Sequence, residues 1–182
     1  VDLVDGTLKT AAPNVPRFDR GRLLIEPERT NLVSYSAYDA TTWSNVFPTY
    51  ASLAGGVADP KGGTSGCRFS CNGTGLALLR ITFPPVTCDG ATAYTVSWWV
   101  KKISGAGAPL ADVHDGAPLS YAAALSTGNW VRVVQTFTPP AGTISWLDIY
   151  NNLTSTLVLD FWGVQIEVGS AATELIETSG SV

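Results

Sequence analysis

The sequence predicts an all-β protein, a two-sheet antiparallel β-sandwich of jelly-roll type, and three observations support this fold class. Hydrophobic residues make up 45% of the 182 residues, which is enough for one domain with a sizeable core. Many of the 18 glycines and 11 prolines fall between short apolar runs, as turns between strands do. No window has the periodicity of a long helix, and residues 120–125 are the only local helix candidate.

The chain is predicted to begin with an extended arm over residues 1–22. Pro13 and Pro16 oppose a helix there and favour extended backbone. The β-sandwich domain is then expected to occupy residues 23–182, with residues 23–25 as its first strand. The sequence contains no methionine, so we expect that Val1 is not a translation start and that the chain is a processed product or part of a longer polypeptide.

Later strands are signalled by short apolar or alternating runs that end in Gly, Pro or Asn. The double proline Pro84-Pro85 is expected to end the first of them. The predicted strands are residues 76–83, 94–102, 129–137, 144–150 and 157–168.

Alternation along three of these strands separates a core side from a solvent side, because successive side chains of a strand point to opposite faces. The residues expected on the core side are Tyr94, Val96, Trp98, Val100, Leu147, Ile149, Trp162, Val164 and Ile166. Phe161 falls on the other side. If the three strands are neighbours in one sheet, the solvent side carries Trp99, Lys101, Trp146, Asp148, Tyr150, Gln165 and Glu167.

Those seven side chains have the chemistry that sugars require. Aromatic planes cover the apolar C–H faces of a pyranose, while carboxylate, amide and ammonium groups bind its hydroxyls. We therefore predict that they bind a glycan. The alternative is structural: Trp146 and Tyr150 pack under a loop or against another subunit, and Gln165 and Glu167 brace buried backbone.

The charge balance argues against nucleic acid and membrane partners. The formal net charge is −4 and the pI about 4.8, and the basic residues do not form clusters that would neutralise phosphates. No apolar run reaches the roughly 20 residues that a helix needs to cross a bilayer.

Catalytic chemistry finds little support in the sequence. There is no G-x-S-x-G motif, and paired carboxylates for glycosidase chemistry cannot be brought together from sequence alone. The single histidine, His114, lies between Asp112 and Asp115 in a Gly/Pro-rich loop and is expected to be structural or solvent-exposed; the alternative is a general base or a metal ligand. We predict that the protein is not an enzyme; a polysaccharide-degrading activity is the less favoured alternative.

The three cysteines are an odd number, which does not suit a disulfide framework. Buried or half-buried free thiols are expected at Cys67, Cys71 and Cys88. The alternative is one disulfide with one thiol left over.

Two segments carry a resemblance to a known family. They are GRLLIEPERTNLVSYSAYDATTW, from Gly21 to Trp43, and FWGVQIEVGSAATELIETSG, from Phe161 to Gly180. Both resemble segments of bacteriophage tail-fibre, head-fibre and decoration proteins, as do NVPRFD, YTVSWWVKK and NWVRVVQTFTPPAG. In such proteins a module of this kind resembles a carbohydrate-binding β-sandwich of the jelly-roll or concanavalin A-like type.

This resemblance implies a non-catalytic protein of the virion surface that binds host-surface carbohydrate. The alternative is a purely structural capsid or fibre component. The resemblance also implies other virion proteins as partners, and a homotrimer, for which residues 1–22 would serve as a tether. Similar modules often hold a structural calcium, for which the matching positions here are Glu26 and Asp160.

Overall fold

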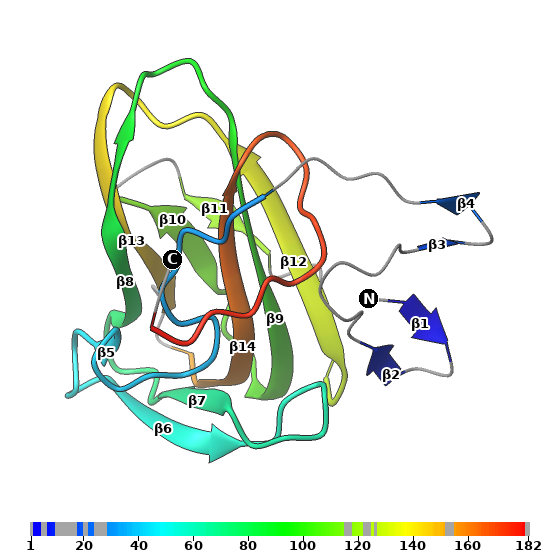
Figure 1. Cartoon of the computed structure of the whole chain (residues 1–182). Helices are drawn as coiled ribbons and strands as arrows, with labels where there is room; N and C mark the ends of the chain where they lie inside the picture. Colours follow the sequence, from blue (N-terminus) through cyan, green and yellow to red (C-terminus); the bar gives the residue numbers. More distant parts are fainter. Residues whose placement is uncertain are drawn as a thin grey trace.

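Two five-stranded antiparallel sheets pack face to face in the computed structural model of the chain (Figure 1). The structure describes residues 29–180 except 115–117, 122–124, 126 and 152–154, together with the backbone of four short strands before residue 29. The described chain has no helix that could span a membrane. The predicted fold class, an antiparallel two-sheet jelly-roll sandwich, is confirmed.

The first sheet, called the β14 sheet here, has the strand order β12-β9-β14-β7-β6. Its strands are β12 (Trp130–Phe137), β9 (Tyr94–Gly105), β14 (Leu157–Val168), β7 (Gly66–Cys71) and β6 (Ala51–Val57). The second, called the β13 sheet, has the order β11-β10-β13-β8-β5. Its strands are β11 (Leu119–Ser120), β10 (Leu110–Val113), β13 (Gly142–Asn151), β8 (Ala77–Cys88) and β5 (Trp43–Asn45).

The core lies between the two sheets and is built from alternate residues of the strands. Tyr94, Val96, Trp98 and Val100 of β9 are all buried, as are Leu147 and Ile149 of β13, which confirms the predicted core side of both strands. Trp98 meets Tyr121 edge to face, with ring centroids 5.2 Å apart. All three cysteines are buried and free, as expected for apolar thiols.

Strand β8 differs from its prediction because it continues through Pro84-Pro85 to Cys88. The two prolines are exposed, and they coincide with the register irregularity of the β13–β8 pairing between Ile144 and Trp146. The other neighbour, β5, pairs with β8 only from Leu79 to Ile81. A proline is tolerated at such a place because its missing N–H interrupts no regular ladder.

The alternation of β14 is also broken, and here the prediction for two residues is wrong. Phe161 pairs with Val100 and points into the core, whereas Trp162 pairs with Trp99 on the outer face. The β14–β9 register shifts between Trp162 and Gln165, and Gly163 within this bulge has φ +67°. One extra residue in the bulge inverts the alternation, so Val164 and Ile166 return to the core as predicted.

The four strands before residue 29 form two hairpins. Strand β1 (Asp2–Val4) pairs with β2 (Thr7–Lys9), and β3 (Phe18–Asp19) pairs with β4 (Arg22–Leu23). Leu23 therefore pairs with Phe18 and not, as predicted, with a strand of the sandwich. The rest of that predicted first strand lies outside the described residues.

Candidate functional site

The predicted seven-residue site is divided between the two sheets. Strands β9 and β14 are neighbours in one sheet, but β13 lies in the other. The expectation of one shared face is therefore wrong. Trp99, Lys101, Gln165 and Glu167 belong to the β14 sheet, and Trp146, Asp148 and Tyr150 belong to the β13 sheet. The two groups point away from each other, on opposite outer faces of the sandwich.

Gln165 and Glu167 are completely buried beneath the C-terminal segment. Glu167 accepts hydrogen bonds from the Thr173 backbone N–H (3.0 Å) and hydroxyl (2.6 Å), and from Gln165 Nε2 (2.6 Å). Gln165 Oε1 accepts a bond from the Ile176 N–H at 2.6 Å. These side chains hold the chain end against the sheet, as the structural alternative for them proposes.

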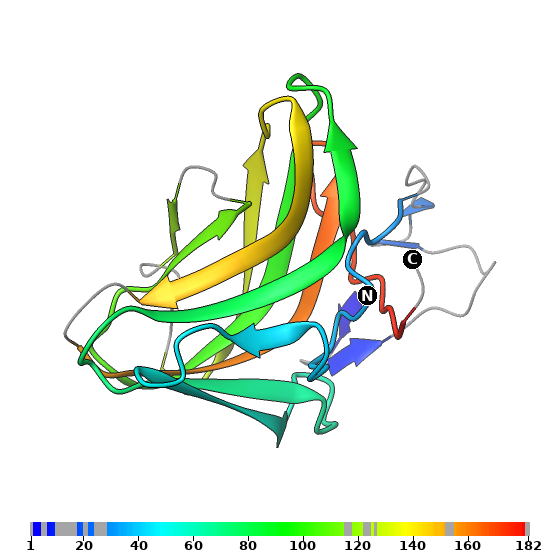
Figure 2. The ribbon, with the colours of Figure 1, turned by 90° about the vertical axis from the view of Figure 1, so that its left-hand side faces the viewer.

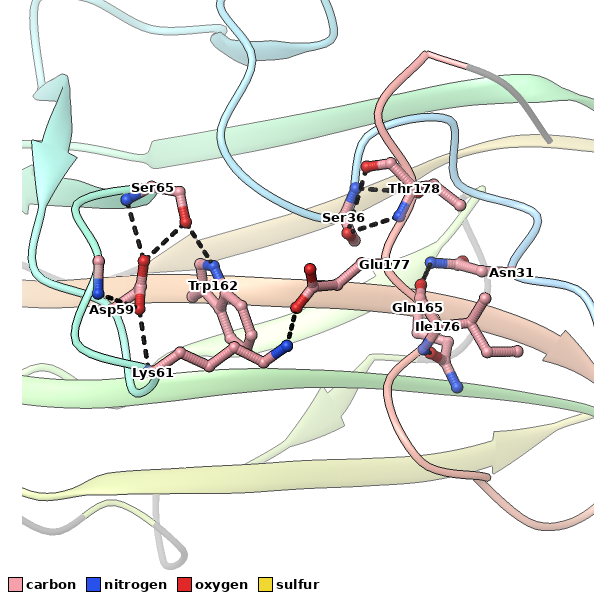
Figure 3. A network of polar contacts seen from close by, with 11 residues as sticks. Asn31, Ser36, Asp59, Lys61, Ser65, Trp162, Gln165, Ile176, Glu177 and Thr178 are labelled. Atoms are coloured by element: carbon pink, nitrogen blue, oxygen red, sulfur yellow. Dashed lines mark hydrogen bonds and ion pairs between the residues drawn. The ribbon is translucent and has the colours of Figure 1, made fainter. Parts of the chain in front are cut away.

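Asn31 joins the entering segment to the same part of the sheet (Figure 3). Its amide nitrogen donates to the carbonyls of Val164 (3.1 Å) and Ile176 (3.0 Å). Its oxygen accepts bonds from the N–H groups of Val33 and Ile166, both at 3.1 Å. The entering and C-terminal segments thus cover much of the outer face of the β14 sheet, as the blue and red chains in front of β14 show (Figure 1).

A second set of contacts in Figure 3 holds Trp162 on that face. Asp59 accepts hydrogen bonds from the hydroxyl and N–H of Ser65, and Ser65 Oγ accepts one from the Trp162 indole N–H at 2.8 Å. Lys61 lies over the Trp162 ring and pairs with Glu177 of the C-terminal segment. Trp162 is therefore enclosed as well.

The other two predicted residues of this sheet, Trp99 and Lys101, also make structural contacts. A side chain at Gly163 would meet Trp99 and Leu175, which places the indole close to the C-terminal segment. The Lys101 ammonium lies 4.9 Å from the Trp130 ring centroid and 3.4 Å from the Asp160 carboxylate.

The predicted calcium site does not fit the groups around Asp160. Its two oxygens accept bonds from Arg68 Nε (2.7 Å) and Nη2 (3.0 Å), and Lys101 lies beside it. Calcium needs six to eight oxygen ligands. The positive charges of Arg68 and Lys101 would also repel a calcium ion at this carboxylate. Glu26 lies outside the described residues, and no group of three metal-ligating side chains occurs in the described part of the chain.

The outer face of the β13 sheet is open by comparison. Figure 2 views the molecule from this side, with β8 and β13 in front and the terminal segments gathered at the right. Strand pairing arranges the outward side chains in rows across the sheet. The central row is Ser44, Arg80, Asp148 and Asp112; one neighbouring row includes Thr82 and Trp146, and the other is Leu78, Tyr150, Leu110 and Ser120.

Arg80 and Asp148 form the centre of this face. Arg80 Nε and Nη2 donate to the two oxygens of Asp148 at 2.8 and 2.6 Å. The Asp148 side chain is almost fully buried, and the arginine side chain is 31% exposed. Two parallel charge-assisted hydrogen bonds therefore compensate for the burial of the carboxylate. The same guanidinium lies 4.5 Å from the ring centroid of Trp146.

Trp146 is half-buried and contacts planar groups from both neighbouring strands. Arg80 reaches it from β8, and His114, at the end of β10, lies with its ring centroid 3.7 Å away at an interplanar angle of 34°. The indole is therefore not the freely exposed platform that alternation predicted. Both Arg80 and His114 fix its position on the face.

Tyr150 is the second half-buried aromatic residue of the face. Burial raises the pKa of its phenol, and the carboxylates of Asp112 and Asp148 raise it further. Its O–H also bonds the Asp112 side chain, so the phenol oxygen can serve a ligand as an acceptor, next to the donors of Arg80. Such mixed donors and acceptors on an aromatic face can bind polyhydroxylated molecules.

Two members of the site were missed or misjudged from the sequence. Arg80 occupies a polar position in the alternating run of β8, and that position could have been assigned to the solvent side. His114 was expected to be structural or solvent-exposed; it contacts the Trp146 ring, a partner that the sequence did not indicate, and has the left-handed φ of +49°. Asp115 lies outside the described residues.

No family model and no curated protein matches this sequence. Solved structures do share the fold. A xylan-binding CBM22 domain of Paenibacillus barcinonensis has a TM-score of 0.51 at 11% identity, over 80% of this chain and 95% of that one. The family 11 carbohydrate-binding module of a Clostridium thermocellum cellulosomal cellulase has a TM-score of 0.51 at 11% identity, over 82% of this chain and 99% of that one.

A bacteriophage structure is also similar. The enzymatically active domain of tailspike protein 4 of bacteriophage CBA120 has a TM-score of 0.56 at 12% identity. The match covers 76% of this chain but 21% of that chain. At these identities the likeness establishes the fold that the chain shares with carbohydrate-binding modules, a β-sandwich of jelly-roll type.

Proposed function

We propose that this domain is a non-catalytic carbohydrate-binding module whose ligand lies on the outer face of the β13 sheet. The observation that carries the proposal is the contrast between the two faces. The terminal segments cover the predicted residues of the β14 sheet, while the other face presents Trp146 and Tyr150 on either side of the Arg80–Asp148 pair. Aromatic groups flanking fixed polar groups suit a sugar's alternating apolar and hydroxyl surfaces.

The size of the face suits more than one sugar residue. Trp146 and Tyr150 are four residues apart on one strand, a separation of about 13 Å at the usual rise of a β-strand. That is wider than a single pyranose ring, so we expect an oligosaccharide or the side of a polysaccharide chain to be the ligand. The structural similarity to a xylan-binding domain and a cellulase module supports this class of ligand.

The charged groups of the face support binding over catalysis. Asp148 and Asp112 are paired across β13 and β10, but Arg80 binds both oxygens of Asp148. A carboxylate held in this way is poorly placed for catalysis, because both of its oxygens already accept hydrogen bonds from the guanidinium.

A place on a bacteriophage virion is part of the proposal. Its support is the resemblance of Gly21–Trp43 and Phe161–Gly180 to fibre and decoration proteins, together with the tailspike similarity. In that setting the ligand is host-surface carbohydrate, and weak binding at each site gains strength from repeated copies. Self-association as a homotrimer, which the same resemblance implies, belongs to this proposal.

The test is affinity electrophoresis and calorimetry against a panel of soluble plant and bacterial polysaccharides. Tyr150→Ala and Trp146→Ala are expected to weaken binding about tenfold or more. Trp130→Ala is the matched control, since Trp130 is also half-buried beside a cation, Lys101, but lies on the other sheet. Equal losses in all three variants, or no binding to any polysaccharide by the unaltered protein, would remove the proposal.

A further inference from the structure

A pocket of about 410 Å³ opens at the end of the sandwich where β12 leads into β13. Its wall is mainly apolar, with side chains from both sheets and from the connecting segment. Among the lining residues are Val113, Leu119, Phe137, Pro139, Pro140 and Ile144. This volume lies within the range of small-molecule sites, roughly 300–1,000 Å³.

His114 connects this pocket to the proposed carbohydrate face. It lines the pocket, and its imidazole also stacks on Trp146 with 3.7 Å between ring centroids. His114 is thus the one residue that the pocket lining and the Trp146 contact share among the described residues.

Two buried nitrogens at this junction lack hydrogen-bond partners. His114 Nδ1 and Trp146 Nε1 make no hydrogen bond within the described structure. An unpaired buried polar atom is costly, so a ligand that separates the two rings and offers these nitrogens a donor or an acceptor gains an advantage. His114 also has a left-handed φ, +49°, which a non-glycine residue seldom adopts.

The lining determines which part of a glycan would enter. An unsubstituted hexose carries hydroxyls around its ring and would leave several unpaired against valine, leucine and proline side chains. An acyl substituent has a methyl end for the apolar wall, and its amide has a donor and an acceptor for the imidazole at the rim. Such a substituent therefore matches both the apolar wall of the pocket and the imidazole of His114 at its rim.

We infer that the pocket is a subsite for the acetamido group of an N-acetylated amino sugar, with His114 at its rim as a specificity-determining residue. This inference rests on the proposed carbohydrate binding and names its ligand class. It predicts that N-acetylated sugars bind more tightly than the same sugars without the acetamido group. An added apolar group in a fitted pocket commonly changes affinity about tenfold or more.

The test compares matched monosaccharides by NMR titration of the whole chain. The pairs are N-acetylglucosamine with glucose, N-acetylgalactosamine with galactose, and N-acetylmannosamine with mannose. At least one N-acetylated sugar is expected to bind about tenfold more tightly than its partner. Equal affinity within every pair, alongside polysaccharide binding that Tyr150→Ala weakens, would overturn the inference while the proposed function stands. No binding by any sugar or polysaccharide would remove both.

Two variants examine the pocket itself. His114→Asn removes the imidazole but keeps a residue that tolerates the left-handed backbone. Leu119→Trp fills the pocket from a half-buried position on an edge strand. Both are expected to abolish the preference for the N-acetylated sugar, while Trp130→Ala keeps it. A preference that persists in both variants, with chemical shifts that show each one folded, would contradict the assignment.

Discussion

Arg80 and Asp148 are joined across β8 and β13 by two parallel hydrogen bonds of 2.8 and 2.6 Å. The strands place them directly opposite each other, and Arg80 also contacts Trp146. The pair therefore fixes an arginine and an aromatic ring in the middle of the open face. Its geometry links the stability of the sheet to the shape of the proposed binding surface.

Asp148→Asn is expected to lower the free energy of unfolding by about 1–3 kcal/mol, because the neutral amide cannot accept two charge-assisted bonds from Arg80. Urea denaturation followed by tryptophan fluorescence would measure the loss. Glu177→Gln is the control, since it removes an ion pair with Lys61 in which the glutamate side chain is 52% exposed. That change should cost less than about 1 kcal/mol. Similar losses for the two variants would contradict the role assigned to Asp148.

Gly163→Ala is expected to destabilise the protein more than Gly128→Ala. Both glycines have a left-handed φ, +67° and +82°, so both alanines carry backbone strain of roughly 1–2 kcal/mol. A Cβ at Gly163 would lie 3.0 Å from Trp99 and 3.2 Å from Leu175, whereas at Gly128 it would meet nothing within 4 Å. The difference in unfolding free energy therefore reports the close packing at the bulge. A larger loss at Gly128 would show that the bulge is not tightly packed.

Asn31→Ala is expected to cost about 3 kcal/mol or more, because it removes four hydrogen bonds and leaves one buried carbonyl, one half-buried carbonyl and two buried N–H groups without this partner. The side chain joins the entering segment to β14 and to the C-terminal segment, so hydrogen exchange should accelerate around Ile176. Asn72→Ala is the control at an exposed turn, where Asn72 bonds Thr49 and Thr74. There the expected loss is below about 1 kcal/mol. Unchanged exchange at Ile176 in Asn31→Ala would refute this role for Asn31.

Asp89 is expected to make stability depend on pH in acid. Hydrogen bonds from the Thr92 and Ala91 backbone N–H groups and the Thr92 hydroxyl lower the pKa of its carboxyl from 3.8 to about 2. Because the folded-state value is the lower one, the stabilisation is complete above pH 3.8 and is lost as the pH falls towards about 2. Asp89→Asn should flatten this part of the profile of unfolding free energy against pH. An unchanged slope between these pH values would show that the turn does not hold the carboxylate.

The candidate site could be predicted only in part from the sequence. Alternation located Trp146, Asp148 and Tyr150 on the outer side of their strand, because β13 is regular over residues 146–150. It failed at Phe161 and Trp162, since the bulge at Gly163 adds one residue and inverts the faces. A bulge depends on how the partner strand aligns, which local alternation does not contain.

The sequence by itself determined that the chain is an all-β sandwich, which alternating runs separated by glycine and proline turns specify through local backbone preferences. It also determined which side of β9 and β13 faces the core, because burial of apolar side chains follows directly from their spacing. Only the tertiary structure decided that β13 lies in a different sheet from β9 and β14, that Gln165 and Glu167 lie beneath the chain end, and that Arg80 and His114 flank Trp146. These relationships join residues far apart in the chain, so they depend on strand order and long-range pairing and not on local pattern.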